Sequence, residues 1–528
     1  MPRAPGKGCE MRRVTVTDAA GRPLKITLLT DWDLLFCVPY SVVSFLYRIM
    51  RIGLYLVVQI PISAVMVTLT KCNVSLIWSI ICFPILIAGA SAMTATGGAF
   101  SSLDLVGAVT VFLIGAALMA KVLMNSPHFE DARIPSRGKL SPSEVAAVAR
   151  IRAEAATLPD SCVRNTLDKS ILYVGFVRTL LFVPALICAV LLPASWVAYA
   201  LDAYVVLFVF NDFELIEHIS AHAPNGRLLI AQNAPWWARF SESLRRYVVW
   251  PLFGWFPDMY FVTHAMHHHV ENNGPADWQS TLRYDRASLL DFTKLVTWFG
   301  MNIVLPFETV SYMTQRRGLR FKRFLIRGAF VYLILFTILA LANPLLFLLL
   351  AADIVFAGFG SYRFFSVWHG FHDAGHPYDI EAGNQSLLHY AHHAQPHIHL
   401  RDFDNLGRVA QNIEKPSCVA ILRPEFEARL PFWRLQGLLW SKDFESASEC
   451  LVEHSFVTAL DMERDERAAF FLRRGLVGRG LGAGALKKRT ASFIHIIRPR
   501  WLEALDNQLS KAVGKIVSGR RPRPANET

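Results

Sequence analysis

Charged residues are scarce in this chain. They make up 18% of its 528 residues, whereas soluble domains carry about 25%. Hydrophobic residues make up 53%, and the mean hydropathy is +0.32. This balance favours a membrane protein. The net charge of +12 comes from basic residues that flank apolar stretches, as in positive cytoplasmic loops. We therefore expect no nucleic-acid partner, although a basic excess is also typical of nucleic-acid binding.

Closely spaced cysteine pairs are also missing from the sequence. None of the eight cysteines belongs to a C-x-x-C motif, which argues against zinc ribbons, ferredoxin-type clusters and a disulfide scaffold. The sequence has no His-Pro-Gly-Gly haem motif and no G-x-G-x-x-G loop placed after a strand. Residues 1–26 are basic and lack an apolar core, so no cleavable signal peptide is expected. Any metal must then be held by nitrogen or oxygen, and any electrons must come from a separate protein.

Histidine, in contrast, is concentrated in one part of the chain. Fourteen of the 17 histidines fall between His218 and His399, and many are three or four positions apart. On an α-helix such residues share one face, where several imidazoles can converge on one ion. The H-x-x-H-H triplet occurs twice, although chance would give it roughly 0.02 times. The main groups are His218/His222, His264/His267/His268 and His389/His392/His393.

Apolar stretches near the 20-residue length of a membrane span occur along the chain. Val74–Met93 and Asp104–Met124 are clear candidates. Leu34–Leu69 is interrupted by Arg48 and Arg51, so it is either one span with an interfacial helix or a tight pair. Two helical hairpins are predicted from apolar stretches with short uncharged turns: Ile171–Leu192 with Trp196–Phe210, and Gly328–Leu341 with Leu345–Phe359.

The basic outer ends of both hairpins place those ends in the cytoplasm by the positive-inside rule. Each histidine group follows a hairpin, so all groups are predicted to reach the same cytoplasmic side. Leu289–Tyr312 is apolar but has cytoplasmic features at both ends, and we interpret it as membrane-associated or re-entrant. From about Leu422 to Thr528 the chain is polar and basic, which predicts a helical appendage for docking or regulation.

The order H-x-x-x-H, H-x-x-H-H, H-x-x-H-H, with two spans before the third box, resembles the integral-membrane fatty acid desaturases and the related alkane hydroxylases. The resemblance covers roughly residues 171 to 408. It implies two irons on the cytoplasmic face, which use dioxygen and electrons to attack an unactivated C–H bond. It also implies a further ligand before the third box, here His372 or His369. The implied ligands are His218, His222, His264, His267, His268, His372, His389, His392 and His393.

The histidines outside this set are expected to support the ligands or to lie apart from them. His269 is off the α-helical face of His264 and His268, and His397 and His399 alternate after Pro396 as in an extended segment. Ligating histidines usually donate their second N–H to a carboxylate or carbonyl. Six acids are candidates for that role: Glu214, Glu217, Glu271, Asp277, Asp373 and Asp404. Asp202 and Asp353 lie within the return helices, where an acid either packs helices or serves function.

The three histidine boxes do not distinguish desaturation from hydroxylation. The box spacings and the paired hairpins look like those of desaturases. His389 to Pro396 and Pro275-Ala276-Asp277 with Ser280 look like alkane hydroxylases. We expect an acyl-lipid desaturase of lipid metabolism, with alkane or fatty acid hydroxylation as the alternative. A metal transporter is the alternative from another class, although the predicted spans hold almost no histidine. The implied electron donor is a ferredoxin, a rubredoxin or a cytochrome b5.

The sequence therefore predicts an all-α fold: a multi-pass transmembrane helical bundle with a cytoplasmic, histidine-rich di-metal cap. Three segments are expected. Residues 1–168 form an N-terminal membrane region and basic loop, residues 169–421 form the di-iron catalytic domain, and residues 422–528 form the basic appendage.

Overall fold

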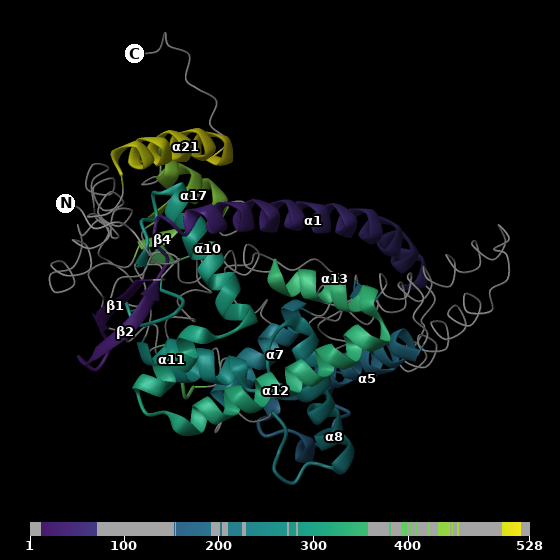
Figure 1. Ribbon diagram of the computed structural model, residues 1–528. Helices are drawn as coiled ribbons and strands as arrows, with labels where there is room; N and C mark the ends of the chain where they lie inside the picture. The colour runs from purple at the N-terminus through teal and green to yellow at the C-terminus, as the bar shows by residue number, and fades with distance from the viewer. Residues whose placement is uncertain are drawn as a thin grey trace. The chain divides into compact units, whose positions relative to one another are not determined.

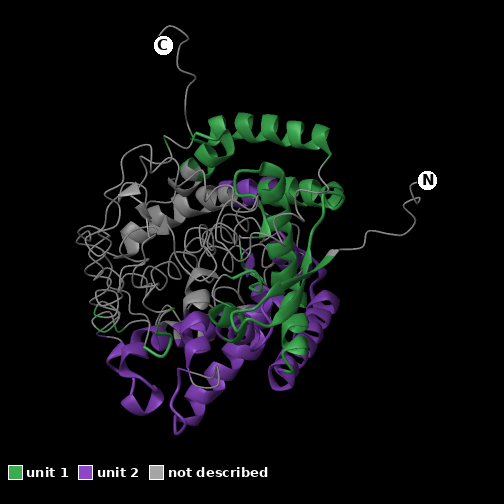
Figure 2. Cartoon of the chain, turned by 90° about the vertical axis from the view of Figure 1, so that its left-hand side faces the viewer, with its two compact units in different colours: residues 1–45, 266–317, 357–528 green, residues 46–265, 318–356 purple. Residues whose placement is uncertain are grey.

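The computed structural model of the chain is mostly helical. It divides into two compact units: unit 1 comprises Met1–Phe45, Met266–Arg317 and Ala357–Thr528, and unit 2 comprises Leu46–Ala265 and Gly318–Phe356 (Figure 2). Segments of the two units alternate along the chain. The division of the chain into residues 1–168, 169–421 and 422–528 stays a prediction. The residues that the structure describes are 12–70, 153, 155–191, 201–202, 210–223, 229–271, 274–280, 283–356, 380–381, 393, 395–398, 402, 405, 408, 420–422, 431–443, 446, 451–452 and 499–518.

Unit 2 is helical throughout its described elements, and Figure 1 labels the main ones. It takes the second part of helix α1 (Leu34–Thr70), whose first part belongs to unit 1. Short 3₁₀ turns at Asp160–Cys162 and Thr166–Asp168 lead into α5. The other helices are α5 (Lys169–Leu191), α7 (Phe210–His222), α8 (Trp236–Leu244), η7 (Arg245–Val249), η8 (Trp250–Phe253), α12 (Leu319–Ala342) and α13 (Pro344–Val355).

Among the residues that the structure describes, two helices are long and apolar enough to cross a membrane: Leu34–Arg51 within α1, and α12. Only 28% and 22% of these windows are buried inside the protein. Large apolar side chains such as Phe330 and Leu341 are exposed on α12. So much uncovered apolar surface is unfavourable in water, whereas the hydrocarbon of a bilayer covers it. The predicted spans Val74–Met93 and Asp104–Met124 lie outside the described residues.

The second predicted hairpin is present. Helix α12 ends at Ala342, and α13 begins at Pro344, with Asn343 between them. The Asn343 side-chain oxygen accepts a hydrogen bond from the Leu346 N–H at 3.1 Å, and its amide donates to the Ala189 carbonyl of α5 at 2.8 Å. One asparagine thus caps α13 and ties the turn to the first hairpin. That hairpin is described at α5 and at Leu201–Asp202; its turn lies outside the described residues.

A buried guanidinium joins three helical segments of unit 2. Arg51 of α1 donates through Nη1 to Asp202 at 2.6 Å and through Nη2 to Asp353 of α13 at 2.9 Å. The hydroxyl of Tyr47 donates to the other oxygen of Asp353 at 2.5 Å. Buried charges are costly unless they are paired and hydrogen-bonded. The two acids that the sequence singled out within the predicted return helices therefore share one partner, an arginine that interrupts the first apolar stretch.

Unit 1 contains the strands of the structure, which the prediction of an all-α fold did not include. β1 (Arg12–Thr17) and β2 (Pro23–Leu28) form an antiparallel hairpin. Leu24, Ile26 and Leu28 alternate inward along β2, as in a strand with one face on a core. A second sheet has the order β3-β4-β5, formed by β3 (Ile380–Glu381), β4 (Ala420–Leu422) and β5 (Leu451–Val452), with β3 and β4 parallel.

The apolar stretch Leu289–Tyr312 forms two helices of unit 1, α10 (Leu289–Val304) and α11 (Phe307–Gln315). Pro306 separates them, since proline lacks the N–H that would continue the first helix. Most of α10 is buried, and its residues Leu290 and Trp298 share a core with Leu29, Leu34 and Cys37. This stretch is therefore a packed internal helix followed by a shorter one, and it is not a single span. The C-terminal helices are α17 (Pro431–Ser441) and α21 (Arg500–Ser518).

We predict that Arg51→Met lowers the free energy of unfolding by about 3–5 kcal/mol, because it leaves two buried carboxylates without their cation. Arg51→Met combined with Asp202→Leu and Asp353→Leu should recover most of that loss, since the whole charged group is then replaced by apolar side chains. Unfolding in a denaturing detergent titration measures both. Arg48→Met, at an exposed arginine of the same helix, is the matched control. Equal losses in the two single variants would contradict the assigned role of Arg51.

Candidate metal centre

The first histidine pair lies on one face of α7. His218 is buried and His222 is half-buried, and their ring centroids are 5.3 Å apart. The spacing of four places them one helical turn apart. Glu217 of the same helix forms a buried ion pair with Arg245, which also binds both oxygens of Glu242, at 2.8 Å and 2.5 Å. Burial opposes the charge of Arg245, but the two carboxylates outweigh it and raise its pKa. This pairing fixes α7 beside α8 and η7.

The second histidine group lies on a widened helix. The segment η9 (Phe261–His268) is a π-helix, and it continues directly into α9 (His269–Glu271). In a π-helix the hydrogen bonds run from residue i to i+5, so each turn holds more residues than in an α-helix. Residues four and five positions apart then share a face, and a residue three positions apart turns away. His264 accordingly shares its face with His268 and His269, whereas His267 points elsewhere.

Four imidazoles come together around His264. Its ring centroid is 4.5 Å from that of His218 and 5.2 Å from that of His222, with both pairs nearly perpendicular. One ligand atom from each of His218, His222, His264 and His269 lies within 4.8 Å of the others. His269 belongs to the set because it follows His264 on the same continuous helical segment. Metal–nitrogen bonds of about 2 Å put two nitrogens on opposite sides of an ion about 4 Å apart. The four rings are therefore close to the spacing that one ion requires.

His267, a predicted ligand, has a different environment. Its Nε2–H donates to the Ala276 carbonyl at 3.0 Å, because a carbonyl can only accept. Its Nδ1 then accepts from the Thr309 hydroxyl at 3.0 Å, and the ring stacks on Tyr312 at 3.9 Å. Burial, despite the nearby charge of Asp277, lowers the pKa of His267 to about 4, so the ring is neutral. Both ring nitrogens are engaged within unit 1, and a metal would have to displace one of these bonds.

His268 is held by a carboxylate. Its Nδ1 lies 2.6 Å from Oδ2 of Asp277, and the other oxygen of Asp277 accepts from the Gln279 N–H at 2.9 Å. Burial favours the protonated acid, but His268, His267 and the Gln279 amide outweigh burial and lower the pKa of Asp277. An ionised carboxylate on Nδ1 directs Nε2 toward a metal, as in carboxylate–histidine–metal sites. This contact confirms the expectation that Asp277 supports a box histidine.

The third box is represented by His393. Its ring stacks on His269 at 3.9 Å and meets His268 edge-on at 5.0 Å, all within unit 1. His397 is exposed, in agreement with its expected place outside the ligand set. Nine of the 17 histidines lie outside the described residues, among them three predicted ligands, His372, His389 and His392, and His369 as the alternative to His372. Their roles stay predictions.

Compared with known proteins, the chain matches no family model, no curated protein and no solved structure. The chemistry of the centre therefore rests on its own donors. Imidazole nitrogen suits iron, copper, zinc and nickel. The described histidines supply one group of four and a second group of His268 and His393 beside His269. Such a set is suited to hold metal.

The other predicted supporting acids whose side chains the structure describes, Glu217 and Glu271, contact residues other than histidine. Glu271 accepts from the Tyr312 hydroxyl at 2.6 Å and from the Ala19 N–H at 2.9 Å, and burial raises its pKa. These bonds connect the end of the box-two helix to α11 and to the turn after β1. The side chain of Glu214, and Asp373 and Asp404, lie outside the described residues. The spacing of residues in the sequence could not identify Thr309 and Tyr312 as contacts of His267, or Arg245 as the partner of Glu217, because these contacts join distant parts of the chain.

We predict that His269→Ala lowers the metal content of the purified protein by at least about half, since the π-helix turns His269 toward His264. His267→Ala should retain the metal but lower the melting temperature, because it removes two buried hydrogen bonds and a stacking contact. Elemental analysis and thermal unfolding measure the two effects. His397→Ala, at an exposed histidine, is the control. Metal loss in His267→Ala alone would instead support the α-helical register that the sequence predicts.

Proposed function

We propose that this chain is a membrane-bound, oxygen-dependent di-iron oxidoreductase that desaturates the acyl chain of a lipid. The observation that carries the proposal is the convergence of His218 and His222 with His264, which is 42 positions further along than His222. Neutral imidazoles brought together in this way compete for donors, and charged ones repel each other. A bound cation removes both costs, and the apolar helices suit a lipid substrate.

Two ions fit the donor set better than one. One ion would take His218, His222, His264 and His269. A second would take His268 and His393 with the remaining third-box histidines, since nine or ten imidazoles exceed the four to six ligands of a single metal. When bound, the irons supply the one-electron and dioxygen chemistry that an unactivated C–H bond requires.

The residues of the chain hold and orient this centre. Asp277 fixes the tautomer of His268, so that Nε2 faces the metal. The ion pair of Glu217 with Arg245 holds α7, and therefore His218, beside η7 within unit 2. Most of the box histidines that the structure describes are buried, which keeps bulk water from the reacting carbon. Exposed apolar helix surface such as that of α12 gives the acyl tail a path outside water.

Hydroxylation is the second candidate, and one observation favours it. The run Pro275-Ala276-Asp277, which resembles alkane hydroxylases, contacts the second box directly: the Ala276 carbonyl binds His267, and the Asp277 carboxylate binds His268. The part of the chain that resembles hydroxylases therefore contacts two histidines of the second box and orients one of them, His268, as a ligand in this proposal. Desaturation removes hydrogens from two neighbouring carbons, whereas hydroxylation places an oxygen on one carbon.

We expect two irons per purified chain, and loss of one unsaturated or hydroxylated lipid from cells that carry His264→Ala. Elemental analysis and lipid profiling measure these outcomes. His264 supplies a metal–ligand bond that alanine cannot replace, so metal content and product should fall together. His392→Ala tests the third box in the same way.

The matched control is His397→Ala, which should leave both readouts unchanged. An unsaturated product would assign desaturation, and an oxygenated product would assign hydroxylation. Zinc as the sole bound metal, or an unchanged lipid profile in His264→Ala, would contradict the proposal. Accumulation of metal in the cell without any change in lipids would favour the transporter alternative.

The electron donor is proposed to be an acidic protein that docks on a basic cytoplasmic face. The start of α12 carries Arg320, Lys322 and Arg323, and Arg316 and Arg317 precede it in the sequence. Opposite charge accelerates the encounter of two proteins, and salt screens this effect over about 10 Å at 0.1 M.

We predict that kcat/KM for a purified ferredoxin, rubredoxin or cytochrome b5 falls as salt rises. Arg320→Gln with Arg323→Gln should lower kcat/KM at low salt several-fold and flatten its salt dependence. Arg13→Gln with Lys25→Gln, which removes the same charge from the strands β1 and β2, is the control. Turnover that is independent of salt would show that electrostatic steering plays no part.

A further inference from the structure

Helix α21 buries its small and polar face and exposes its apolar face. The buried stripe is Asp506, Ser510, Gly514 and Ser518, at intervals of four residues. On the opposite side of the helix an apolar stripe is exposed, formed by Trp501, Leu505, Leu509, Ala512 and Ile516. Trp501 and Ile516 are 67% and 79% exposed. Surface helices usually bury their apolar face and expose their polar face. We therefore expect the exposed apolar stripe of α21 to contact a binding partner.

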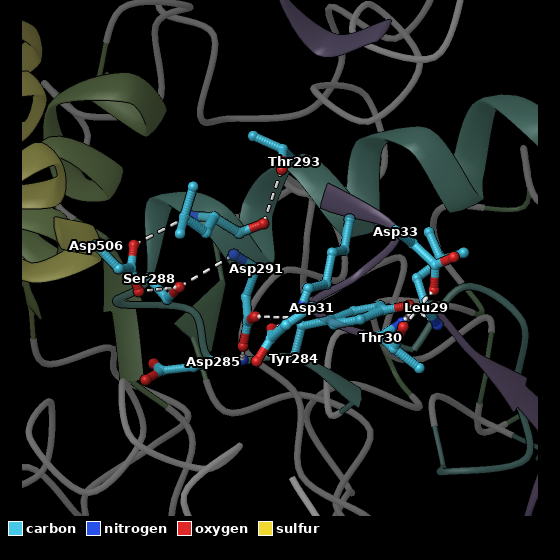
Figure 3. Close-up of polar contacts among 12 residues, drawn as sticks. Leu29, Thr30, Asp31, Asp33, Tyr284, Asp285, Ser288, Asp291, Thr293 and Asp506 are labelled. Atoms are coloured by element: carbon cyan, nitrogen blue, oxygen red, sulfur yellow. Dashed lines mark hydrogen bonds and ion pairs between the residues drawn. The ribbon is translucent and has the colours of Figure 1, made fainter. Parts of the chain in front are cut away.

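The contacts of the buried stripe fix this orientation. The carboxylate of Asp506 accepts from the Ser288 hydroxyl at 2.6 Å and from the Leu290 N–H at 3.1 Å, at the start of α10 (Figure 3). Further along, Gly514 lies against Gly437 of α17 so closely that a Cβ on Gly514 would stand 2.5 Å from the Gly437 oxygen. A rotation that turned the apolar stripe inward would break these hydrogen bonds and this close packing. The stripe therefore stays outside.

A candidate membrane span begins beside α21. Leu502 packs against the core cluster of unit 1 that includes Leu34 and Cys37, in the first turn of α1. The window Leu34–Arg51 is long and apolar enough to cross a membrane. Next to its start, Trp32 and Leu35 are 76% and 81% exposed. Tryptophan is enriched at the boundary between headgroups and acyl chains. Within unit 1, α21 thus lies at the level where α1 would enter the bilayer.

The charges beside the stripe are basic. Arg500, Lys511 and Lys515 are exposed, whereas the acid Asp506 is buried and Glu503 is half-buried. A second copy of the helix would bring the same positive charges together, which is unfavourable. A negatively charged lipid surface covers the apolar stripe and neutralises the lysines at the same time.

We propose that α21 is an interfacial helix that lies on the membrane surface and binds anionic phospholipid. Its apolar stripe enters the boundary between headgroups and acyl chains, and Lys511 and Lys515 contact lipid phosphates. This function is independent of the metal centre. It gives the basic C-terminal part of the chain a lipid-binding role beside the span at Leu34.

The test uses the full chain in lipid nanodiscs, with Ile516→p-benzoylphenylalanine as a photo-crosslinking probe. We expect lipid adducts by mass spectrometry, and at least about a threefold rise when phosphatidylglycerol is added to phosphatidylcholine, because lysines near the surface are attracted to anionic headgroups. Lys511→Gln with Lys515→Gln should remove that rise. Both lysines are exposed, so this variant leaves the packing of α21 intact.

The matched control is Arg13→Gln with Lys25→Gln, which removes two positive charges from exposed positions of the strands β1 and β2 and should leave the lipid adducts unchanged. Crosslinks between two copies of the chain in place of lipid adducts would overturn the proposal, as would the absence of adducts. Lipid adducts with no response to phosphatidylglycerol would also overturn it, because the basic flank would then have no ligand.

Discussion

The winding of one helix decides which histidines meet. From Phe261 to His268 the backbone widens to a π-helix, which continues directly into α9, so His264 shares a face with His269 while His267 points away. A π-helical turn has less favourable packing along its axis than an α-helix, and such turns are found mostly at functional sites. Here the widened turn lets neighbouring histidines serve different partners: His264 faces α7, His267 contacts α11, and His268 contacts Asp277. The metal centre depends on this division.

Charge is scarce in the chain, and the structure uses much of the buried charge in pairs that connect distant segments. Arg51 joins two acids that are 151 and 302 positions away, and Arg245 joins Glu217 to Glu242. An unpaired charge in these places would cost several kcal/mol, so each pair restricts the helices to one arrangement. In unit 2 the paired charges hold the helix of the first box and the helices of the hairpins.

Local spacing and composition allowed a good part of this structure to be predicted. The pairing of His218 with His222, the turn at Asn343 and the contact of Asp277 with a box histidine all follow from short-range rules. The winding of η9 does not, because a π-helix and an α-helix carry the same kinds of residues. The partners of Arg51 could not be predicted either, since nothing local indicates a contact across hundreds of positions. The sheet of β3, β4 and β5 was missed because strands of two or three residues leave no periodic signal. The hairpin of β1 and β2 does alternate between apolar and polar residues, and this signal was not used in the prediction.

Helix α21 shows why polarity alone does not decide which face of a helix is buried. Its sequence offers two stripes of regular spacing, one apolar and one of small and polar residues. Apolar burial usually wins, yet here Asp506 caps α10 and Gly514 permits close contact with α17. The apolar stripe stays available for a solvent other than water. In the proposed arrangement the bilayer beside the candidate span at Leu34 would supply that solvent, and the reversed polarity of α21 would then be stable.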